Sequence, residues 1–222
     1  MNKVFKIIIV LLSIIIIVTC AYYKTLKEGL TNNKTQTIIL IGDSVLNNEN
    51  YVQSGKSVSE QLQNKFSNVI NLSNDGATIQ DLYGQIDNIS NDLNNSSTYI
   101  FISSGGNDIL NKKSGLSANE LTNIFNLYLR FIKSLKTKLP NAKINILNLY
   151  LPTNPKYQSY KSTIDTWNTL IEQNSKNIGE MYIVVDIHSV LTSSEDFVYD
   201  IEPSEKGSEK IANIIYSTYS MR

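Results

Sequence analysis

The feature that most constrains the fold is the alternation of short aliphatic runs with amphipathic segments after about residue 36. The aliphatic runs, typical of buried strands, lie at 37–42, 68–72, 98–103, 143–149 and 181–187. Helical periodicity follows at 57–66, 78–93, 117–139, 159–176 and 204–219. Strands that alternate with helices form a mostly parallel sheet with helices on both faces. The pattern therefore predicts one α/β domain over residues 37–222 with a five-stranded sheet.

Composition excludes several function classes. The chain has 222 residues and a formal net charge of zero, so nothing points to nucleic acid as a partner. Cys20 is the single cysteine, which excludes an intrachain disulfide and a cysteine-based metal site. His188 is the single histidine, which excludes a histidine-rich metal site. We expect neither a metal nor another cofactor.

The N-terminus differs from the rest of the chain. Residues 7–23 are almost wholly apolar and follow Lys3 and Lys6. As a helix, 17 residues span roughly 25 Å, close to the thickness of the hydrocarbon core. We expect residues 1–23 to form a transmembrane anchor and residues 24–36 a polar tether.

Two alternatives to the anchor remain open. A cleaved signal peptide would require small residues at the cleavage site, and "VTCA" fits poorly. A lipoprotein would use Cys20, but Thr19 before it is larger than usual. Lys24 and Lys27 lie beyond the apolar run, so charge asymmetry does not fix the side of the membrane.

Chemistry is expected in the loops after the strands, because ligands of such sheets bind beyond the carboxyl ends of the strands. Gly42-Asp43-Ser44 directly follows the first strand. A serine on a strand-to-helix turn, close to backbone N–H groups, can serve as a nucleophile. The alternative is an ordinary turn with a helix-capping serine.

Two further loops carry candidate oxyanion donors. Gly76 precedes a predicted helix, and its lack of a side chain lets the backbone approach a ligand. The loop "SSGGNDIL" after the third strand contains Asn107, whose side-chain amide could donate to a developing oxyanion. Such a donor is worth roughly 3–4 kcal/mol. The alternative for both loops is a glycine-rich turn with capping residues.

Taken together, "IGDS", Gly76 in "NDGATIQDL", "GGND" and "EPSEKG" resemble the SGNH (GDSL-type) hydrolase superfamily over residues 36–220. The resemblance implies a three-layer, flavodoxin-like α/β/α sandwich. It implies Ser44 as the nucleophile of an ester hydrolase that needs no cofactor. The N–H groups of Ser44 and Gly76 and the side chain of Asn107 would form the oxyanion hole. Asp43 and Asp108 would hold loops in place.

The final block of that family is D-x-x-H, usually followed by proline. Alignment on Pro203 places Glu202 where the histidine belongs and Tyr199 where the aspartate belongs, with Asp200 one position late. His188 lies fourteen residues before Glu202 and cannot be brought into register.

Two interpretations of Glu202 stay open. An unshifted carboxyl, with a pKa near 4.3, is a poorer base than imidazole, but burial could raise that pKa toward 6–7 and permit a Ser–Glu dyad. Alternatively, Glu202 only stabilises the N-terminus of the helix that starts near Ser204. The lead hypothesis is a membrane-tethered esterase for an acyl or acetyl ester of a small molecule, lipid or glycan. The rivals are a non-catalytic ligand- or glycan-binding module and an acyltransferase.

Overall fold

The structure, a computed structural model, describes Thr19 and residues 36–112, 116–177 and 182–220. Residues Gln36–Arg222 form one compact unit. The expected transmembrane helix and tether lie outside the described residues, apart from Thr19 and Gln36. Among the helices described, none has both the length and the apolar character needed to cross a bilayer.

A five-stranded parallel sheet forms the centre of the domain, as predicted. Its strands are β1 (Thr37–Ile41), β2 (Asn68–Asn71), β3 (Thr98–Ile102), β4 (Lys143–Leu147) and β5 (Ile183–Val185). The order across the sheet is β2-β1-β3-β4-β5, and every pair is parallel. This order reverses direction at β1, so β1 and β3 leave the sheet side by side and create a crevice between their loops.

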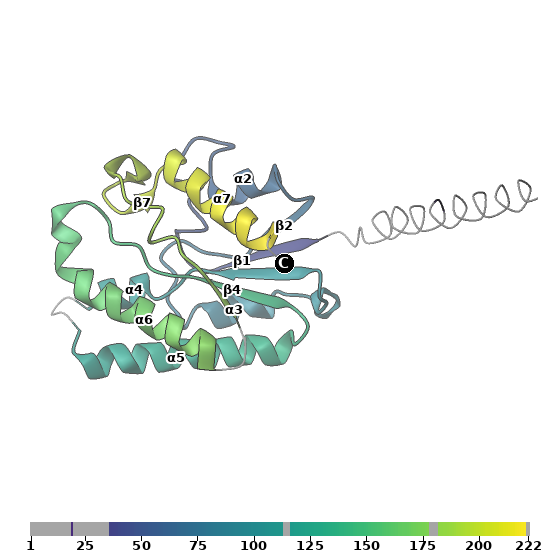
Figure 1. The fold of residues 1–222 in the computed structure, drawn as a ribbon, viewed down its shortest axis with the longest axis horizontal. Coiled ribbons are helices and arrows are strands. Elements are labelled where there is room, and N and C mark those ends of the chain that lie inside the picture. Colours follow the sequence, from purple (N-terminus) through teal and green to yellow (C-terminus); the bar gives the residue numbers. More distant parts are fainter. Residues whose placement is uncertain (1–18, 20–35, 113–115, 178–181, 221–222) are drawn as a thin grey trace, which may run out of the picture. The chain divides into compact units, whose positions relative to one another are not determined.

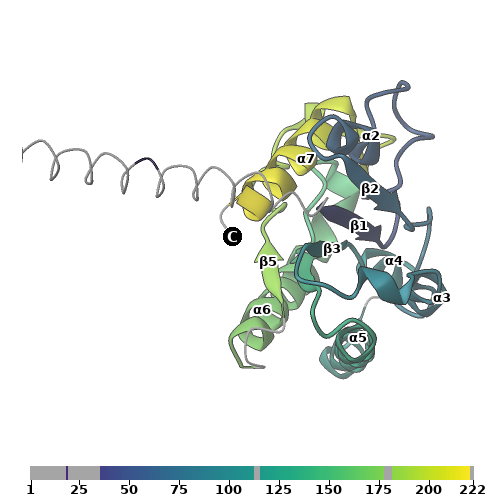
Figure 2. The same ribbon diagram turned by 90° about the vertical axis from the view of Figure 1, so that its right-hand side faces the viewer.

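Helices cover both faces of the sheet (Figures 1 and 2). One face carries α2 (Val58–Gln63) and α7 (Glu205–Ser220). The other carries α3 (Leu82–Asp87), α4 (Gly106–Leu110), α5 (Ala118–Lys138) and α6 (Lys161–Asn177). The short 3₁₀ segments are η1 (Asn91–Leu93), η2 (Pro155–Tyr160) and η3 (Ser194–Asp196). The predicted three-layer arrangement is therefore confirmed.

Alternation along the strands divides the core into two clusters. Ile39 and Ile41 of β1 pack with α3, α5 and α6, whereas Ile38 and Leu40 pack with α2 and α7. All four side chains are fully buried. Both sides of a central parallel strand are thus apolar, which explains why these strands appear in the sequence as continuous aliphatic runs. The described members of both clusters come from residues 36–222 alone.

Two of the helices start at a serine that caps the first turn. Ser57 and Ser117 each accept the N–H of a glutamate three residues on, and that glutamate accepts the serine N–H in return. These capping boxes satisfy N–H groups that a helix start otherwise leaves unpaired.

The predicted helix over 78–93 is wrong in its extent. The N–H and hydroxyl of Thr78 both donate to Asp81 Oδ2, at 2.8 and 2.7 Å, and form a turn before α3. The helix is then only six residues long, and η1 follows as a separate turn. Short polar side chains that bond the nearby backbone compete with helix formation, which accounts for the late start.

Two short elements escaped the sequence analysis. α4 has five residues and starts after Gly105, whose φ of 101° is left-handed. The strands β6 (Phe197–Val198) and β7 (Glu202–Pro203) pair in an antiparallel hairpin. Elements this short show no hydrophobic period, yet β7 carries Glu202.

Candidate active site

The loop after β1 is held against β3 without a side chain between them. A Cβ on Gly42 would lie 2.0 Å from the Ser103 carbonyl oxygen, and the φ of Gly42 is 142°. Gln85 of α3 binds both backbone groups of Gly42, accepting the N–H at 2.7 Å and donating to the carbonyl at 2.8 Å. Only glycine fits this close approach, and the result is a fixed position for Asp43 and Ser44.

Asp43 is a buried carboxyl beneath the candidate nucleophile. Its Oδ1 accepts the Ser103 hydroxyl at 2.7 Å and the Val45 N–H at 3.2 Å. Burial raises the pKa of Asp43 from 3.8 to about 6, although these hydrogen bonds oppose the rise. Asp43 thus holds the serine loop to β3. Asp108 holds the next loop in a similar way, by accepting the Ile79 N–H at 3.1 Å.

Ser44 is 9% exposed and lies at the wall of a pocket of about 300 Å³. The turn that follows bonds to Asp43 rather than to Ser44, because Leu46 and Asn47 both donate to the Asp43 carbonyl. The Ser44 N–H makes no hydrogen bond within the described residues. An N–H left unpaired beside a hydroxyl is available to a ligand.

Asn107 and Glu202 line the same pocket as Ser44. Asn107 stands in the first turn of α4, and its Nδ2 donates to the Ala77 carbonyl at 3.0 Å. A primary amide has two N–H donors, so one remains for a ligand. Three of the four residues predicted for the site therefore lie around one cavity.

Gly76, the fourth, is exposed and does not line the pocket. Its φ is 72°, and its N–H makes no hydrogen bond within the described residues. It directly precedes Ala77, whose carbonyl binds Asn107. Gly76 thus adjoins the site, with a free donor.

Glu202 lines the same pocket as Ser44. The Ser44 side chain lies close enough to the Glu202 carboxyl to lower its pKa. Burial raises the pKa of Glu202 above its ordinary 4.5, the nearby Ser44 side chain opposes the rise, and the charges of Asp75 and Asp43 add to it. Glu202 Oε2 is buried and has no hydrogen-bond partner within the described residues.

The backbone on either side of Glu202 is fixed by two distant side chains. Tyr150 donates its hydroxyl to the Ile201 carbonyl at 2.8 Å. Asn48 donates Nδ2 to the Pro203 carbonyl at 3.1 Å. Because both neighbours are held, the backbone keeps Glu202 in the lining of the pocket that it shares with Ser44.

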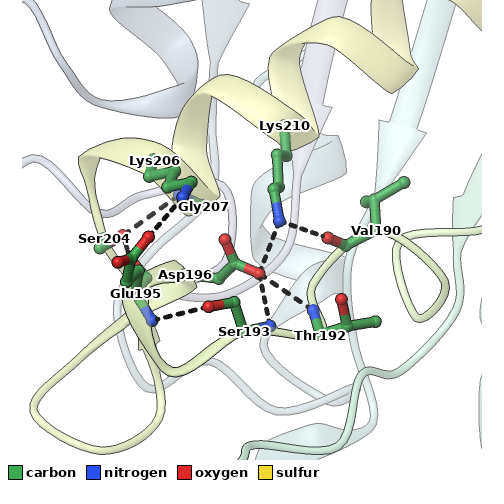
Figure 3. A network of polar contacts seen from close by, with 9 residues as sticks. All are labelled: Val190, Thr192, Ser193, Glu195, Asp196, Ser204, Lys206, Gly207 and Lys210. Carbon is green, nitrogen blue, oxygen red and sulfur yellow. Dashed lines mark hydrogen bonds and ion pairs between the residues drawn. The ribbon is translucent and has the colours of Figure 1, made fainter.

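A polar network beside α7 fixes the base of the hairpin (Figure 3). Fully buried Asp196 accepts the N–H groups of Thr192 and Ser193, both at 2.9 Å, and the Lys210 ammonium at 2.7 Å. The Ser204 N–H donates to the Asp196 carbonyl at 2.9 Å. This network joins the segment before β6 to the residue after β7, and so anchors both ends of the hairpin that carries Glu202.

The other candidates for the final block lie elsewhere. Tyr199 is 70% exposed, with a φ of 48°. Asp200, with a φ of 70°, forms an ion pair with Lys156 at 2.8 Å. His188 does not line the pocket, and its Nδ1 lies 3.1 Å from the Leu149 carbonyl oxygen. None of the three orients Glu202.

The rest of the pocket is apolar and aromatic, which the sequence analysis did not foresee. The full lining is Asp43, Ser44, Val45, Gly106, Asn107, Ile109, Leu110, Leu149, Tyr150, Pro152, Tyr157, Tyr160, Ile164, Ile201 and Glu202. Tyr157 and Tyr160 of η2 contribute two of the aromatic side chains. No group of three His, Cys, Asp or Glu side chains that could hold a metal occurs among the described residues.

The comparisons with known proteins agree with this architecture. The model of the GDSL-like lipase/acylhydrolase family matches residues 40–210. A member of the lipolytic G-D-S-L family from Veillonella parvula superposes with a TM-score of 0.68 at 19% identity, over 84% of this chain and 99% of that one. A putative acylhydrolase from Bacteroides fragilis gives 0.66 at 14% identity, over 85% and 88%.

A structure described as an acetyl xylan esterase gives a TM-score of 0.64 at 14% identity, over 82% of this chain and 98% of that one. At such identities the likeness concerns the fold alone. No curated protein matches the chain.

Proposed function

This chain belongs to the GDSL-like lipase/acylhydrolase family, and from that premise we propose that it is a serine esterase whose general base is Glu202 in place of histidine. The observation that carries the proposal is that Ser44 and Glu202 line one pocket, where burial raises the pKa of the Glu202 carboxyl and the Ser44 side chain lies close enough to affect it. A carboxylate becomes a better base as its pKa approaches the working pH. Burial thus supplies part of what the replaced imidazole would have supplied.

In the acylation step, Ser44 Oγ attacks the ester carbonyl carbon and Glu202 takes the hydroxyl proton. The carbonyl π electrons move onto oxygen, where the N–H groups of Ser44 and Gly76 and one N–H of Asn107 Nδ2 stabilise the charge. When the intermediate collapses, the C–O bond to the alcohol breaks and Glu202 returns the proton to the leaving oxygen. The products are the free alcohol and an ester of Ser44.

Deacylation repeats these steps with water. Glu202 takes a proton from the water that attacks the acyl carbon, and it then donates that proton to Ser44 Oγ as the bond to the serine breaks. The acid leaves and the enzyme returns to its starting state. Because Glu202 Oε2 has no hydrogen-bond partner in the described part of the chain, the proposed reaction relies on two side chains rather than three, and we expect slower turnover than a Ser-His-Asp triad gives.

We also propose that the chain is held at a membrane by residues 1–23, with residues 24–36 as the tether. The support is the apolar run of residues 7–23 after Lys3 and Lys6. Fractionation of cells that express the full chain tests this. The protein should stay with membranes after alkaline carbonate extraction, whereas residues 36–222 should be released; release of both would contradict an anchor.

Labelling of the serine tests the catalytic proposal. Residues 36–222 are incubated with a fluorophosphonate probe, and hydrolysis of p-nitrophenyl butyrate is measured with and without Ser44→Ala. We expect labelling at Ser44 and loss of hydrolysis in the variant. Failure to label Ser44, with equal rates for both proteins, would instead support the binding module. The absence of an orienting partner on Glu202 Oε2 among the described residues is the observation that favours that second candidate.

A further inference from the structure

We propose that the pocket beside Ser44 is an acyl site for a neutral, unbranched chain of about four to eight carbons, and that Leu110, Tyr157 and Ile164 set the chain length. This inference rests on the proposed esterase function and names its substrate class. The proposed chain length distinguishes this protein from esterases that remove acetyl groups, because an acetyl group would leave most of the pocket empty.

The charged and amide side chains that line the pocket belong to three residues. Besides Ser44, Asn107, Asp43 and Glu202, the lining consists of Gly106 and of aliphatic, proline and tyrosine side chains. The Tyr150 hydroxyl is already used by the Ile201 carbonyl at 2.8 Å. Beyond the reacting end the pocket therefore favours hydrocarbon.

The charges around the pocket also favour a neutral acyl chain. The charged side chains that line the pocket are the carboxyls of Asp43 and Glu202. The nearby ammonium of Lys156 is paired with Asp200 at 2.8 Å and lies 4.9 Å from the centre of the Tyr157 ring. A phosphate or carboxylate on the acyl group would meet carboxyls and find no free cation among the residues that line the pocket, so the acyl chain is neutral.

The volume limits the length of the chain. At roughly 30 Å³ per non-hydrogen atom, the share of a water molecule in the liquid, the pocket of about 300 Å³ holds about ten such atoms. The ester group uses some of them. About four to eight carbons remain, whereas a two-carbon acyl group would leave the apolar walls without contacts.

Leu110, Tyr157 and Ile164 stand out because they line the pocket yet belong to neither core cluster. Ile164 is only 7% exposed. Ile164 is thus buried without being a member of either cluster, and it lines the pocket. Ile109, by contrast, lines the pocket and belongs to a cluster.

Alkyl fluorophosphonates test the proposal on the full chain in lipid nanodiscs. Ser44 Oγ bonds to phosphorus, fluoride leaves, and Glu202 takes the serine proton, so the alkyl group reports on the acyl site. We compare labelling rates for ethyl and hexyl probes. Each buried methylene is worth about fourfold, so four added methylenes should accelerate labelling by tenfold to about 200-fold.

Variants distinguish binding of the alkyl group in the pocket from partition of the probe into lipid, because every variant is measured in the same lipid. Leu110→Trp should fill the pocket and bring the hexyl-to-ethyl ratio close to one. Tyr157→Ala should change the ratio at least threefold. Tyr216→Ala is the matched control: Tyr216 also carries a lysine ammonium over its ring, from Lys65 at 5.3 Å, but does not line the pocket. Its ratio should equal that of the unchanged chain.

The outcomes distinguish the two proposals. If Ser44 is labelled at equal rates by both probes, or if Leu110→Trp keeps the preference for hexyl, the acyl site is contradicted while the esterase stands. If neither probe labels Ser44, the esterase fails and the acyl site fails with it.

Discussion

Lys156 Nζ and Asp200 Oδ2 form an ion pair at 2.8 Å between η2 and the turn of the β6–β7 hairpin. Both side chains are about half exposed, and Asp200 has left-handed backbone angles. The acid nearest to the family's aspartate position therefore faces a surface lysine, while Glu202 faces Ser44. This arrangement is the one that the proposed Ser44–Glu202 dyad requires, because Asp200 is paired with Lys156.

Loss of Asp200 should accordingly matter little. In a Ser-His-Asp triad, removing the aspartate lowers kcat by about 10⁴, whereas an exposed ion pair contributes only about 0–1 kcal/mol. We expect Asp200→Asn to change kcat/KM for p-nitrophenyl butyrate by less than about threefold, with Lys156→Gln as the matched variant. A thousandfold loss in Asp200→Asn alone would show that Asp200 orients the base.

Activity should rise with pH, because Glu202 must be ionised to accept the serine proton. The pKa of Glu202 is raised above 4.5 by burial, and the negative charge of Asp75 adds to the rise. Asp75→Asn removes that charge and can still accept the Tyr51 hydroxyl, now at 2.5 Å from Asp75. The acid limb of the kcat/KM profile should move to lower pH in this variant and stay in place in Asp87→Asn. An upward move would contradict the assignment.

Asp43 should lower stability as pH rises. Burial raises its pKa from 3.8 to about 6, so the folded state holds the proton more tightly than the unfolded state. The contribution is fully present below pH 3.8 and is lost as pH rises through about 6, a change of about 3 kcal/mol. Asp43→Asn keeps an acceptor for Ser103 and Val45 and has no such titration. The free energy of unfolding of Asp43→Asn minus that of the unchanged domain should therefore increase by about that amount between pH 4 and pH 7.

Urea unfolding of residues 36–222 at several pH values measures this difference. Asp87→Asn, on an exposed carboxylate, controls for the change in net charge. A difference that shrinks with rising pH would mean that the buried carboxyl is stabilised in its charged form.

Gly105 should tolerate no side chain. A Cβ at this position would lie 2.3 Å from the Trp167 ring, and its φ is 101°. Gly55 has a φ of 83°, and a Cβ there would meet no atom within 4 Å, so Gly55→Ala isolates the backbone cost. We expect Gly55→Ala to cost about 1–2 kcal/mol and Gly105→Ala several kcal/mol, since Trp167 is fully buried and must shift. Equal losses in urea unfolding would contradict the role of the Trp167 contact.

Much of the fold could be predicted because continuous aliphatic runs, which indicate buried strands, differ from the helical periodicity of the segments between them. The five aliphatic runs became the five strands, and their order of appearance implied parallel pairing. The helix starts depended on side-chain hydrogen bonds: Ser117 caps α5 at the start of its periodic segment, whereas Asp81 delays α3 by bonding Thr78. α4 and the β6–β7 hairpin are too short to show a period, so only tertiary contacts define them.

Part of the site could be predicted from the parallel arrangement of the strands. The loops after β1 and β3 had to meet because neighbouring parallel strands end at one edge, and this places Ser44 near Asn107. The partner of Asp200 and the direction of Glu202 depend on the hairpin and on Tyr150 and Asn48, which are remote in sequence. The apolar wall formed by η2 and α6 is equally a product of tertiary packing.

The central claim is that Glu202 is the base for Ser44, and a comparison of Glu202→Gln with Glu202→His at pH 7 tests it most directly. Gln keeps the shape of the side chain but cannot take a proton, so kcat for p-nitrophenyl butyrate should fall by about 10²–10⁴. His restores a base and should recover at least tenfold of that loss, with both variants folded like the unchanged domain. A Gln variant that keeps its rate within threefold would contradict the account.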